Sequence, residues 1–337
     1  MTAATAPTAP ALVDRHGRAI RYLRVSVTDR CDLRCRYCMA EKMTFLPLDA
    51  LLSLDEMALI AERFVARGVN KIRLTGGEPL VRRDAIDLVR RLGRHVDAGL
   101  GELTLTTNGT RLREFAPVLA DAGVRRINVS LDSRDPDTFR HVTRHGALAQ
   151  VLDGIAAAQT AGLTVKINMV ALKGLNDAEI PDMLDWAGSE GMDLTLIETM
   201  PLGMIEEDRA DRFVPLTRVF DDLARRYTLT PDSHYSGGPA RYWRVAETGR
   251  RLGLISPLTG NFCDSCNRVR LTTEGKLFTC LGHEDQVDLK TAIRNGGLAA
   301  VDAAIDAALL TKPARHDFSV APGAAPAVSR HMNVTGG

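Results

Sequence analysis

The chain contains 337 residues, of which 43 are Lys or Arg and 42 are Asp or Glu, and its formal net charge is +1. So balanced a composition creates no global field that would draw the chain onto nucleic acid or an anionic membrane, and any anionic partner must be bound locally. No apolar run is long enough to span a bilayer, and residues 1–13 lack the basic and apolar regions of a signal peptide. We therefore expect a cytoplasmic protein.

Strand-length apolar runs alternate with helix-length amphipathic segments along residues 18–200. Strands are expected at Arg21 to Val27, Lys71 to Thr75, Leu103 to Thr107, Arg126 to Leu131, Thr164 to Val170 and Leu194 to Glu198. Helices are expected from Ser53 to just before Gly68, and at Asp84 to Arg94, Arg111 to Asp121, Ala147 to Ala161 and Asn176 to Ser189. Such alternation with short loops implies parallel strands with right-handed crossovers. Six units predict an α/β fold, an incomplete (β/α)6 TIM-like barrel.

The pattern changes after Glu198. A loop-like acidic stretch precedes a helix expected at Pro215 to Tyr227, and strands at Arg241 to Glu247 and Gly253 to Ser256 suit a small covering layer. Beyond Pro313 the chain is rich in Ala, Pro and Gly, which predicts a mobile tail. The expected organisation is a flexible N-terminal extension at 1–17, the barrel at 18–200, a C-terminal cluster- and substrate-binding region at 201–312, and the tail at 313–337, ending in Gly336 and Gly337.

The six cysteines fall into two groups of three. Cys31, Cys35 and Cys38 follow the first expected strand, on the face of a barrel where loops build active sites. In a reducing cytosol, cysteines grouped this tightly are more often metal ligands than disulfides. Zinc normally takes four ligands, whereas a four-iron cluster held by three thiolates keeps one iron open. A structural zinc site remains the alternative for this group.

This Cys-x-x-x-Cys-x-x-Cys loop, with Tyr37 before its last cysteine, resembles the signature of radical S-adenosylmethionine (SAM) enzymes. The resemblance implies a [4Fe–4S] cluster whose open iron binds SAM, with a 5′-deoxyadenosyl radical formed on reduction. Residues Thr75 to Pro79, Thr-Gly-Gly-Glu-Pro, resemble the family motif whose backbone meets the amino group of SAM. The SAM pocket that the resemblance implies consists of Tyr37, Gly77, Ser130 and Met200.

Cys263, Cys266 and Cys280 form the second group, again with three thiols. This favours a second cluster with an open iron, although His283 could supply a fourth ligand and restore a zinc site. Arg268 and Arg270 lie two residues apart and face the same way if the segment is extended. Guanidinium groups beside an open iron suit a polyanion such as a triphosphate.

Together, these features resemble the GTP 3′,8-cyclase (MoaA) family of molybdenum cofactor biosynthesis, over about residues 18–337. The resemblance rests on the two cysteine groups, Gly76 to Pro79, Thr106 to Gly109, Arg125 to Asp132 and the terminal glycines. It implies cyclisation of GTP to (8S)-3′,8-cyclo-7,8-dihydroguanosine 5′-triphosphate, with two [4Fe–4S] clusters and SAM as cofactors and no side chain as catalytic acid or base. The implied GTP contacts are Arg24, Arg73, Thr106, Lys166, Arg268, Val269 and Arg270.

Three positions depart from the family pattern. Asp32 stands where Asn is usual, Ala40 where Pro is usual, and Thr335 where Ile precedes the terminal glycines. Neither Asp32 nor Ala40 is a cluster ligand. Gly336 and Gly337 have no side chains and could thread into a narrow active site, as is inferred for the family.

Two other functions remain open from the residues. A radical SAM peptide-modifying maturase also carries auxiliary clusters, but such extensions generally use more cysteines than the three available here. A zinc-dependent nucleic-acid-binding module could use the Cys-x-x-Cys pair and its arginines, but the chain has no basic stripe interleaved with aromatics. The expected partners are GTP and an external electron donor, with a homodimer possible and neither nucleic acid nor membrane involved.

Overall fold

The computed structural model describes residues 11–336. The expected flexible extension at 1–17 lies mostly outside these residues, and only positions 11–17 can be compared with it. There the chain is packed rather than loose, because Leu12 is buried in the main hydrophobic core. Asp14 closes a tight turn by accepting hydrogen bonds from the backbone N–H groups of His16 and Arg18.

One continuous sheet of twelve strands organises the fold. Its order is β12-β11-β10-β1-β2-β3-β4-β5-β6-β9-β8-β7. The strands are β1 Tyr22–Ser26, β2 Lys71–Thr75, β3 Glu102–Thr107, β4 Arg126–Ser130, β5 Thr164–Val170, β6 Asp193–Ile197, β7 Leu229–Asp232, β8 Arg241–Val245, β9 Arg251–Ile255, β10 Arg268–Leu271, β11 Lys276–Phe278 and β12 Gln286–Asp288. β1 to β6 are mutually parallel in sequential order, as the predicted barrel requires.

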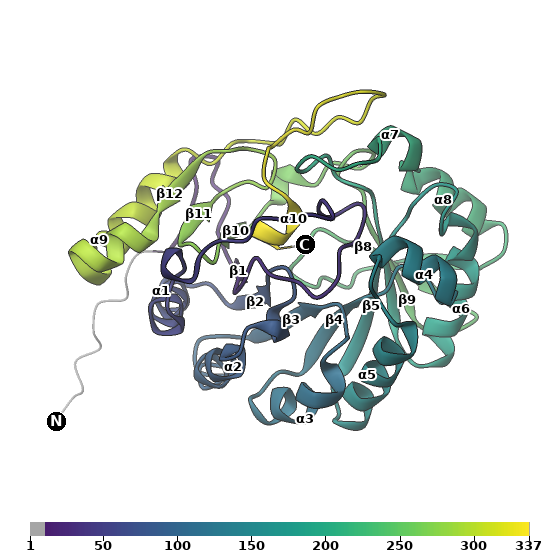
Figure 1. Ribbon diagram of the computed structural model, residues 1–337, viewed down its shortest axis with the longest axis horizontal. Coiled ribbons are helices and arrows are strands. Elements are labelled where there is room, and N and C mark those ends of the chain that lie inside the picture. The colour runs from purple at the N-terminus through teal and green to yellow at the C-terminus, as the bar shows by residue number, and fades with distance from the viewer. Residues whose placement is uncertain (1–10, 337) are drawn as a thin grey trace.

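Helices cover the outer face of this curled sheet, and its inner face surrounds a central opening (Figure 1). The helices are α1 Leu54–Ala66, α2 Ala85–Gly93, α3 Leu112–Asp121, α4 Pro136–Thr143, α5 Leu148–Thr160, α6 Ile180–Ser189, α7 Arg209–Arg212, α8 Leu216–Ala224, α9 Leu289–Leu310 and α10 Met332–Thr335. The predicted capping box is present at the start of α1, between Ser53 and Glu56. No helix among residues 11–336 is long and apolar enough to cross a membrane.

The predicted fold class, an incomplete (β/α)6 barrel, is confirmed. The C-terminal strands, however, do not form a separate layer. β9 pairs in parallel with β6, and β10 pairs in parallel with β1, so both edges of the six-stranded unit are extended within the same sheet. Ladder hydrogen bonds therefore continue past β1 and β6, and the segments around the second cysteine group reach the barrel by this route.

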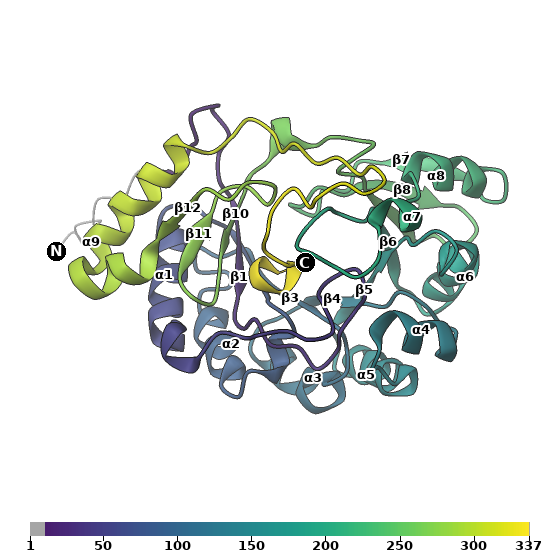
Figure 2. The ribbon, with the colours of Figure 1, turned by 45° about the horizontal axis from the view of Figure 1, so that its top comes forward.

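The C-terminal tail, for which the composition predicts mobility, follows a defined path in the structure. It crosses the barrel opening and ends in the short helix α10, which lies in the middle of that opening in both ribbon views (Figures 1 and 2). Asn333 and Thr335 are 1 % exposed, and the Asn333 side chain donates a 2.7 Å hydrogen bond to the backbone carbonyl of Asp29. Buried contacts thus tie residues 332–336 to the loop after β1.

Candidate active site

The first cysteine group lies on the loop between β1 and α1, at the carboxyl end of the sheet. The N–H groups of Arg34 and Arg36 bond to the carbonyls of Thr143 and Val142, at the end of α4, which fixes the loop. Burial raises the pKa of all three thiols, that of Cys38 to about 12. Bare thiols here would stay protonated, and it takes a bound cation to make them thiolates.

Gly76 and Gly77 allow the end of β2 to pack directly against this loop. A Cβ on Gly76 would lie 2.3 Å from the Thr28 carbonyl oxygen, and one on Gly77 would lie 2.3 Å from that of Arg30. Their close approach lets Gly77 N–H bond to Thr28 at 2.8 Å and Glu78 N–H bond to Arg30 at 2.9 Å. Because these two N–H groups are already hydrogen-bonded, the carbonyls of the motif are the backbone groups that remain to bind a ligand amine.

Two carboxylates anchor side chains around the first cysteine group. Asp32 accepts hydrogen bonds from Asn108 Nδ2 at 2.7 Å and from Thr110 Oγ1 at 2.6 Å. Both partners donate, so a carboxylate is well suited to this position. Tyr37 donates its hydroxyl to Asp132 at 2.8 Å, and burial raises the pKa of that carboxyl to about 6.

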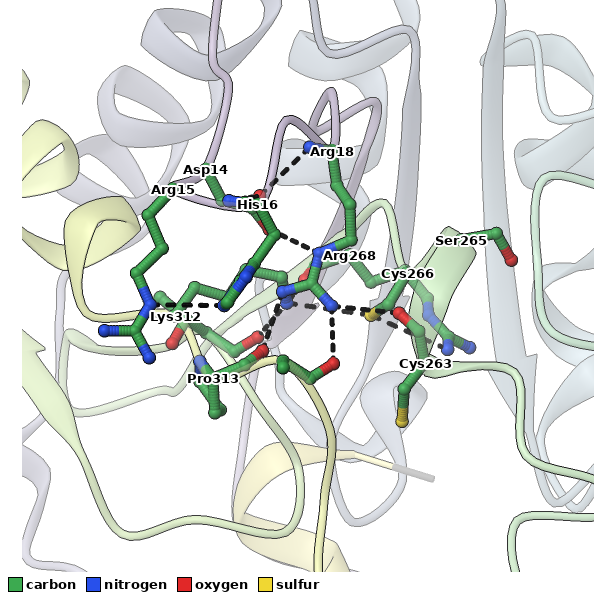
Figure 3. A network of polar contacts seen from close by, with 12 residues as sticks. Asp14, Arg15, His16, Arg18, Cys263, Ser265, Cys266, Arg268, Lys312 and Pro313 are labelled. Atoms are coloured by element: carbon green, nitrogen blue, oxygen red, sulfur yellow. Dashed lines mark hydrogen bonds and ion pairs between the residues drawn. The ribbon is translucent and has the colours of Figure 1, made fainter.

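The second cysteine group lies around β10, with Cys263 and Cys266 before it and Cys280 just after β11. Figure 3 shows Cys266 facing the side chains of Arg268 and Lys312. Burial raises the pKa of the Cys266 thiol, but these two cations outweigh it and lower the pKa to about 6. This thiol is therefore set up as a thiolate, the form that binds iron.

Neither cysteine group forms a ready-made site for a single metal ion. Among residues 11–336, no three His, Cys, Asp or Glu side chains converge closely enough to hold one ion. A four-iron cluster makes no such demand, because its thiolates bind separate irons. His283, the proposed fourth zinc ligand, instead places Nε2 3.0 Å from the carbonyl oxygen of Arg315.

Buried cations line the inside of the barrel next to the second cysteine group. Arg73, Lys166, Arg268 and Arg270 are each less than 10 % exposed, and within residues 11–336 none of them forms an ion pair with a carboxylate. Burial, reinforced by neighbouring cations, lowers the pKa of Lys166 and Arg270. Concentrated positive charge of this kind, without carboxylate partners, suits a polyanionic ligand.

A cavity of about 120 Å³ brings many of the sequence-predicted residues together. Its lining includes Arg24, Arg73, Lys166, Met200, Cys263, Cys266, Arg268, Arg270, Cys280 and Gly336. A wider cavity of about 800 Å³ opens at the amino ends of the strands. The two share Tyr22, Lys166 and Ser236, so they meet inside the barrel.

Eight predicted site residues lie outside the lining of the smaller cavity: Cys31, Cys35, Cys38, Tyr37, Gly77, Thr106, Ser130 and Val269. Thr106 contacts it through Arg73, whose Nη1 donates a 2.9 Å hydrogen bond to Thr106 Oγ1. Tyr37 and Gly77 belong to the first cysteine loop and its neighbour, and Ser130 is the last residue of β4. The extended conformation expected for Arg268 and Arg270 is confirmed by β10.

The side chain of Val269 points the other way. It is 1 % exposed and belongs to the hydrophobic core, because alternate residues of β10 face opposite sides of the sheet. Only the backbone of Val269 could contact a ligand in the barrel.

Tyr22 is one functional candidate that the sequence did not suggest. Burial raises its pKa, but Arg73, Arg24, Lys71 and Arg268 outweigh this and lower the pKa of Tyr22 to about 8. Lys71 Nζ lies 5.2 Å from the centre of the Tyr22 ring and also pairs with Glu102. Of these neighbours, Lys71 could have been identified from the sequence as a candidate site residue. It lies two residues before Arg73 in β2 and therefore on the same face of the strand.

His316 is a second missed candidate, on the wall of the smaller cavity. Its ring stacks on Phe318 at 4.3 Å, and its Nδ1 accepts a hydrogen bond from the Phe318 N–H. Burial lowers the pKa of His316, so the neutral ring carries its proton on Nε2. Nε2 is buried with no hydrogen-bond partner within the described residues, which leaves an unused donor.

The fold and the cysteine loop after β1 define a radical SAM enzyme. Residues 25–187 match the model of the Radical SAM superfamily, and residues 192–318 match that of Molybdenum Cofactor Synthesis C. Enzymes of this class hold a [4Fe–4S] cluster and bind SAM.

The chain belongs to the GTP 3′,8-cyclase family. It is 58 % identical over 327 residues to the GTP 3′,8-cyclase of Erythrobacter litoralis, covering 97 % of this chain and 98 % of that one. It is 59 % identical over 329 residues to that of Agrobacterium fabrum, covering 97 % and 94 %. Two clusters are typical of this family.

Solved structures support the fold alone. Native anSMEcpe with bound AdoMet superimposes with a TM-score of 0.61 at 13 % identity, over 86 % of this chain and 82 % of that one. Streptococcus suis SuiB bound to precursor peptide SuiA gives 0.61 at 16 % identity, over 88 % and 67 %. Identities this low carry no information about the substrate.

Proposed function

We propose that this chain binds GTP and SAM inside the barrel and cyclises GTP to the 3′,8-cyclo-dihydro product. The observation that carries the proposal is the set of buried cations without carboxylate partners, placed directly beside a three-cysteine group. When bound, the first cluster and SAM supply the radical chemistry that removes hydrogen from C3′ of the ribose. The protein's own residues bind the substrate, orient it and exclude water.

The triphosphate would lie among Arg24, Arg73, Lys166, Arg268 and Arg270, with Thr106 as a neutral donor. Guanidinium groups make two-pronged hydrogen bonds to phosphate, and these are strongest away from water. Buried Nε of Arg73 has no hydrogen-bond partner among the described residues, so it is available to a phosphate oxygen. Val269 would contribute through its backbone.

The guanine base would lie against the second cluster, held by Cys263, Cys266 and Cys280. His316 Nε2–H, on the same cavity wall, is suited to donate to an acceptor on the edge of the purine. With both ends of the nucleotide held, C3′ and C8 can be kept close together, and this orientation is the catalytic contribution of the protein.

The first cluster would be held by Cys31, Cys35 and Cys38, and SAM by Tyr37, Gly77, Ser130 and Met200. The Gly77 carbonyl is the group suited to the SAM amine, since the N–H groups there already bond to the cysteine loop. An external electron donor is required to reduce the cluster. We expect a homodimer to be compatible with this activity, and we expect neither nucleic acid nor a membrane to take part.

The direct test is an anaerobic reaction of iron-reconstituted protein with GTP, SAM and dithionite, followed by mass spectrometry. We expect 5′-deoxyadenosine together with a product of the same mass as GTP. Arg268→Ala should lose the GTP-derived product while still binding iron. Formation of 5′-deoxyadenosine with GTP unchanged would mean a different substrate and would favour a peptide-modifying enzyme.

A further inference from the structure

Lys312, just after α9, is a buried lysine with an unusual set of contacts. It is 1 % exposed, yet it lies two residues beyond the end of a surface helix. Its Nζ lies 3.6 Å from Cys266 Sγ and 3.1 Å from the carbonyl oxygen of Arg268, and it also donates to the carbonyl of Thr279. The ammonium group has three N–H donors, and these three acceptors use all of them.

The three acceptors come from the segments that carry the second cysteine group. Cys266 is one of the cysteines, Arg268 begins β10, and Thr279 immediately precedes Cys280. One ammonium group therefore joins the two parts of the chain that must meet to form this group. A lysine at a loop end would gain little from surface contacts, so the burial of this one requires a specific partner.

Charge identifies that partner. Within residues 11–336, no carboxylate lies within ion-pair distance of Lys312. Removing an ammonium from water without an anion is costly, and among the described residues the sulfur of Cys266, 3.6 Å from Nζ, is placed to supply the negative charge. Thiolates bound to iron keep such charge in place permanently.

Arg18 fixes the backbone on both sides of this contact. It donates from Nη1 to the carbonyls of Cys263 at 2.9 Å and Ala314 at 2.8 Å, and from Nη2 to that of Pro313 at 2.7 Å (Figure 3). Asp14, in the N-terminal turn, forms an ion pair with the same guanidinium, and its Oδ2 lies 2.6 Å from Arg18 Nε. The residues after Lys312 are thereby tied to the cysteine group that Lys312 itself contacts.

We propose that Lys312 is a positioning residue of the second cluster. It holds Cys266 and the segment before Cys280 in place, and its charge offsets that of the thiolates. The inference rests on the assignment of Cys263, Cys266 and Cys280 to an iron–sulfur cluster. Hydrogen bonds and positive charge at the sulfurs favour the reduced state, so Lys312 raises the reduction potential of this cluster.

The test uses full-length protein in which Cys31, Cys35 and Cys38 are changed to Ala, so that iron reports on the second group alone. In this background we compare Lys312→Met, which removes the charge, with Lys312→Arg, which keeps it. Lys290→Met is the matched control, because Lys290 is on α9 and bonds to the Ala50 carbonyl, far from the cysteines along the helix. Iron content and a redox titration followed by electron paramagnetic resonance are the readouts.

We expect Lys312→Met to lose iron or to shift the reduction equilibrium about tenfold toward the oxidised cluster, which is roughly 59 mV for one electron. Lys312→Arg should restore much of the iron content and of the reduction potential, and Lys290→Met should leave both unchanged. Equal iron content and potential in Lys312→Met and the unsubstituted background would overturn the proposal. If the background itself binds no iron, the assignment of the second cluster fails and the role of Lys312 fails with it.

Discussion

Arg270 donates a hydrogen bond from Nη1 to the carbonyl oxygen of Gly336, 3.3 Å away. The contact joins an arginine that faces the barrel interior to the end of the chain. The same arginine is one of the residues proposed to hold the triphosphate. The tail therefore occupies the region where the substrate would bind, and its conformation should affect the reaction.

Gly336→Ala should impair catalysis more than a comparable change elsewhere in the tail. Gly336 has φ of 75°, and a Cβ there would lie 2.2 Å from Thr75 Cγ2, so α10 would have to move. Gly323→Ala is the control, since Gly323 has φ of 69° and no heavy atom within 4 Å of the added Cβ. Both variants carry the backbone strain, but only the first carries the clash.

We expect product formation by Gly336→Ala to fall about tenfold or more relative to Gly323→Ala, with iron content unchanged in both. Initial rates of the anaerobic reaction and iron analysis measure the two quantities. Equal rates for the two variants would show that the position of α10 does not matter to the reaction.

His316→Phe should weaken GTP binding, because it keeps the stacking on Phe318 and removes the Nε2–H donor. Loss of one hydrogen bond to a buried acceptor costs about 1 kcal/mol, or roughly fivefold in Kd. Equilibrium binding of GTP to reconstituted protein is the measurement. His283→Phe serves as the control, since His283 contacts the Arg315 carbonyl and does not line the cavity. Equal Kd values for the two variants would show that His316 does not contribute to GTP binding.

GTP affinity should decrease as the pH rises through about 8. The pKa of Tyr22 is held at about 8 by surrounding cations despite the opposing effect of burial. A bound triphosphate neutralises part of that charge, so the pKa of Tyr22 rises and the complex takes up a proton. Below the free-protein pKa the ring is already protonated, and no proton is linked to binding.

Isothermal titration of GTP between about pH 7 and pH 10 measures this linkage, and Tyr22→Phe should flatten the profile. A wild-type affinity that does not change over this range would mean that Tyr22 keeps its proton without GTP, and that the cations do not act on it as described.

Much of the barrel could be predicted from the sequence because its signals are local. All six strands expected before residue 200 are present within one or two residues of their predicted bounds. α4, Pro136–Thr143, was not predicted, and α9 begins at Leu289, nine residues before the apolar stretch of the sequence that starts at Leu298. A non-helical Gly297, with φ of 62°, interrupts the periodicity inside α9 and hides its first turns.

Features that depend on distant partners could not be predicted in this way. β10 has only four residues, and it is a strand because β1 offers a free edge some 245 positions earlier in the chain. Lys312 carries no local motif, since its acceptors lie on segments 33 to 46 residues away. The tail composition predicts mobility, whereas the path of the tail depends on contacts with distant segments, such as those of Asn333 with Asp29 and of Arg330 with Glu284.

The most direct test of the proposed reaction is the transfer of hydrogen from the ribose. Reconstituted protein is incubated anaerobically with SAM, dithionite and GTP deuterated at C3′, and the 5′-deoxyadenosine is analysed by mass spectrometry. We expect 5′-deoxyadenosine that is one mass unit heavier, together with a GTP-derived product that has lost the label. Unlabelled 5′-deoxyadenosine, formed while the GTP keeps its deuterium, would contradict the proposed reaction.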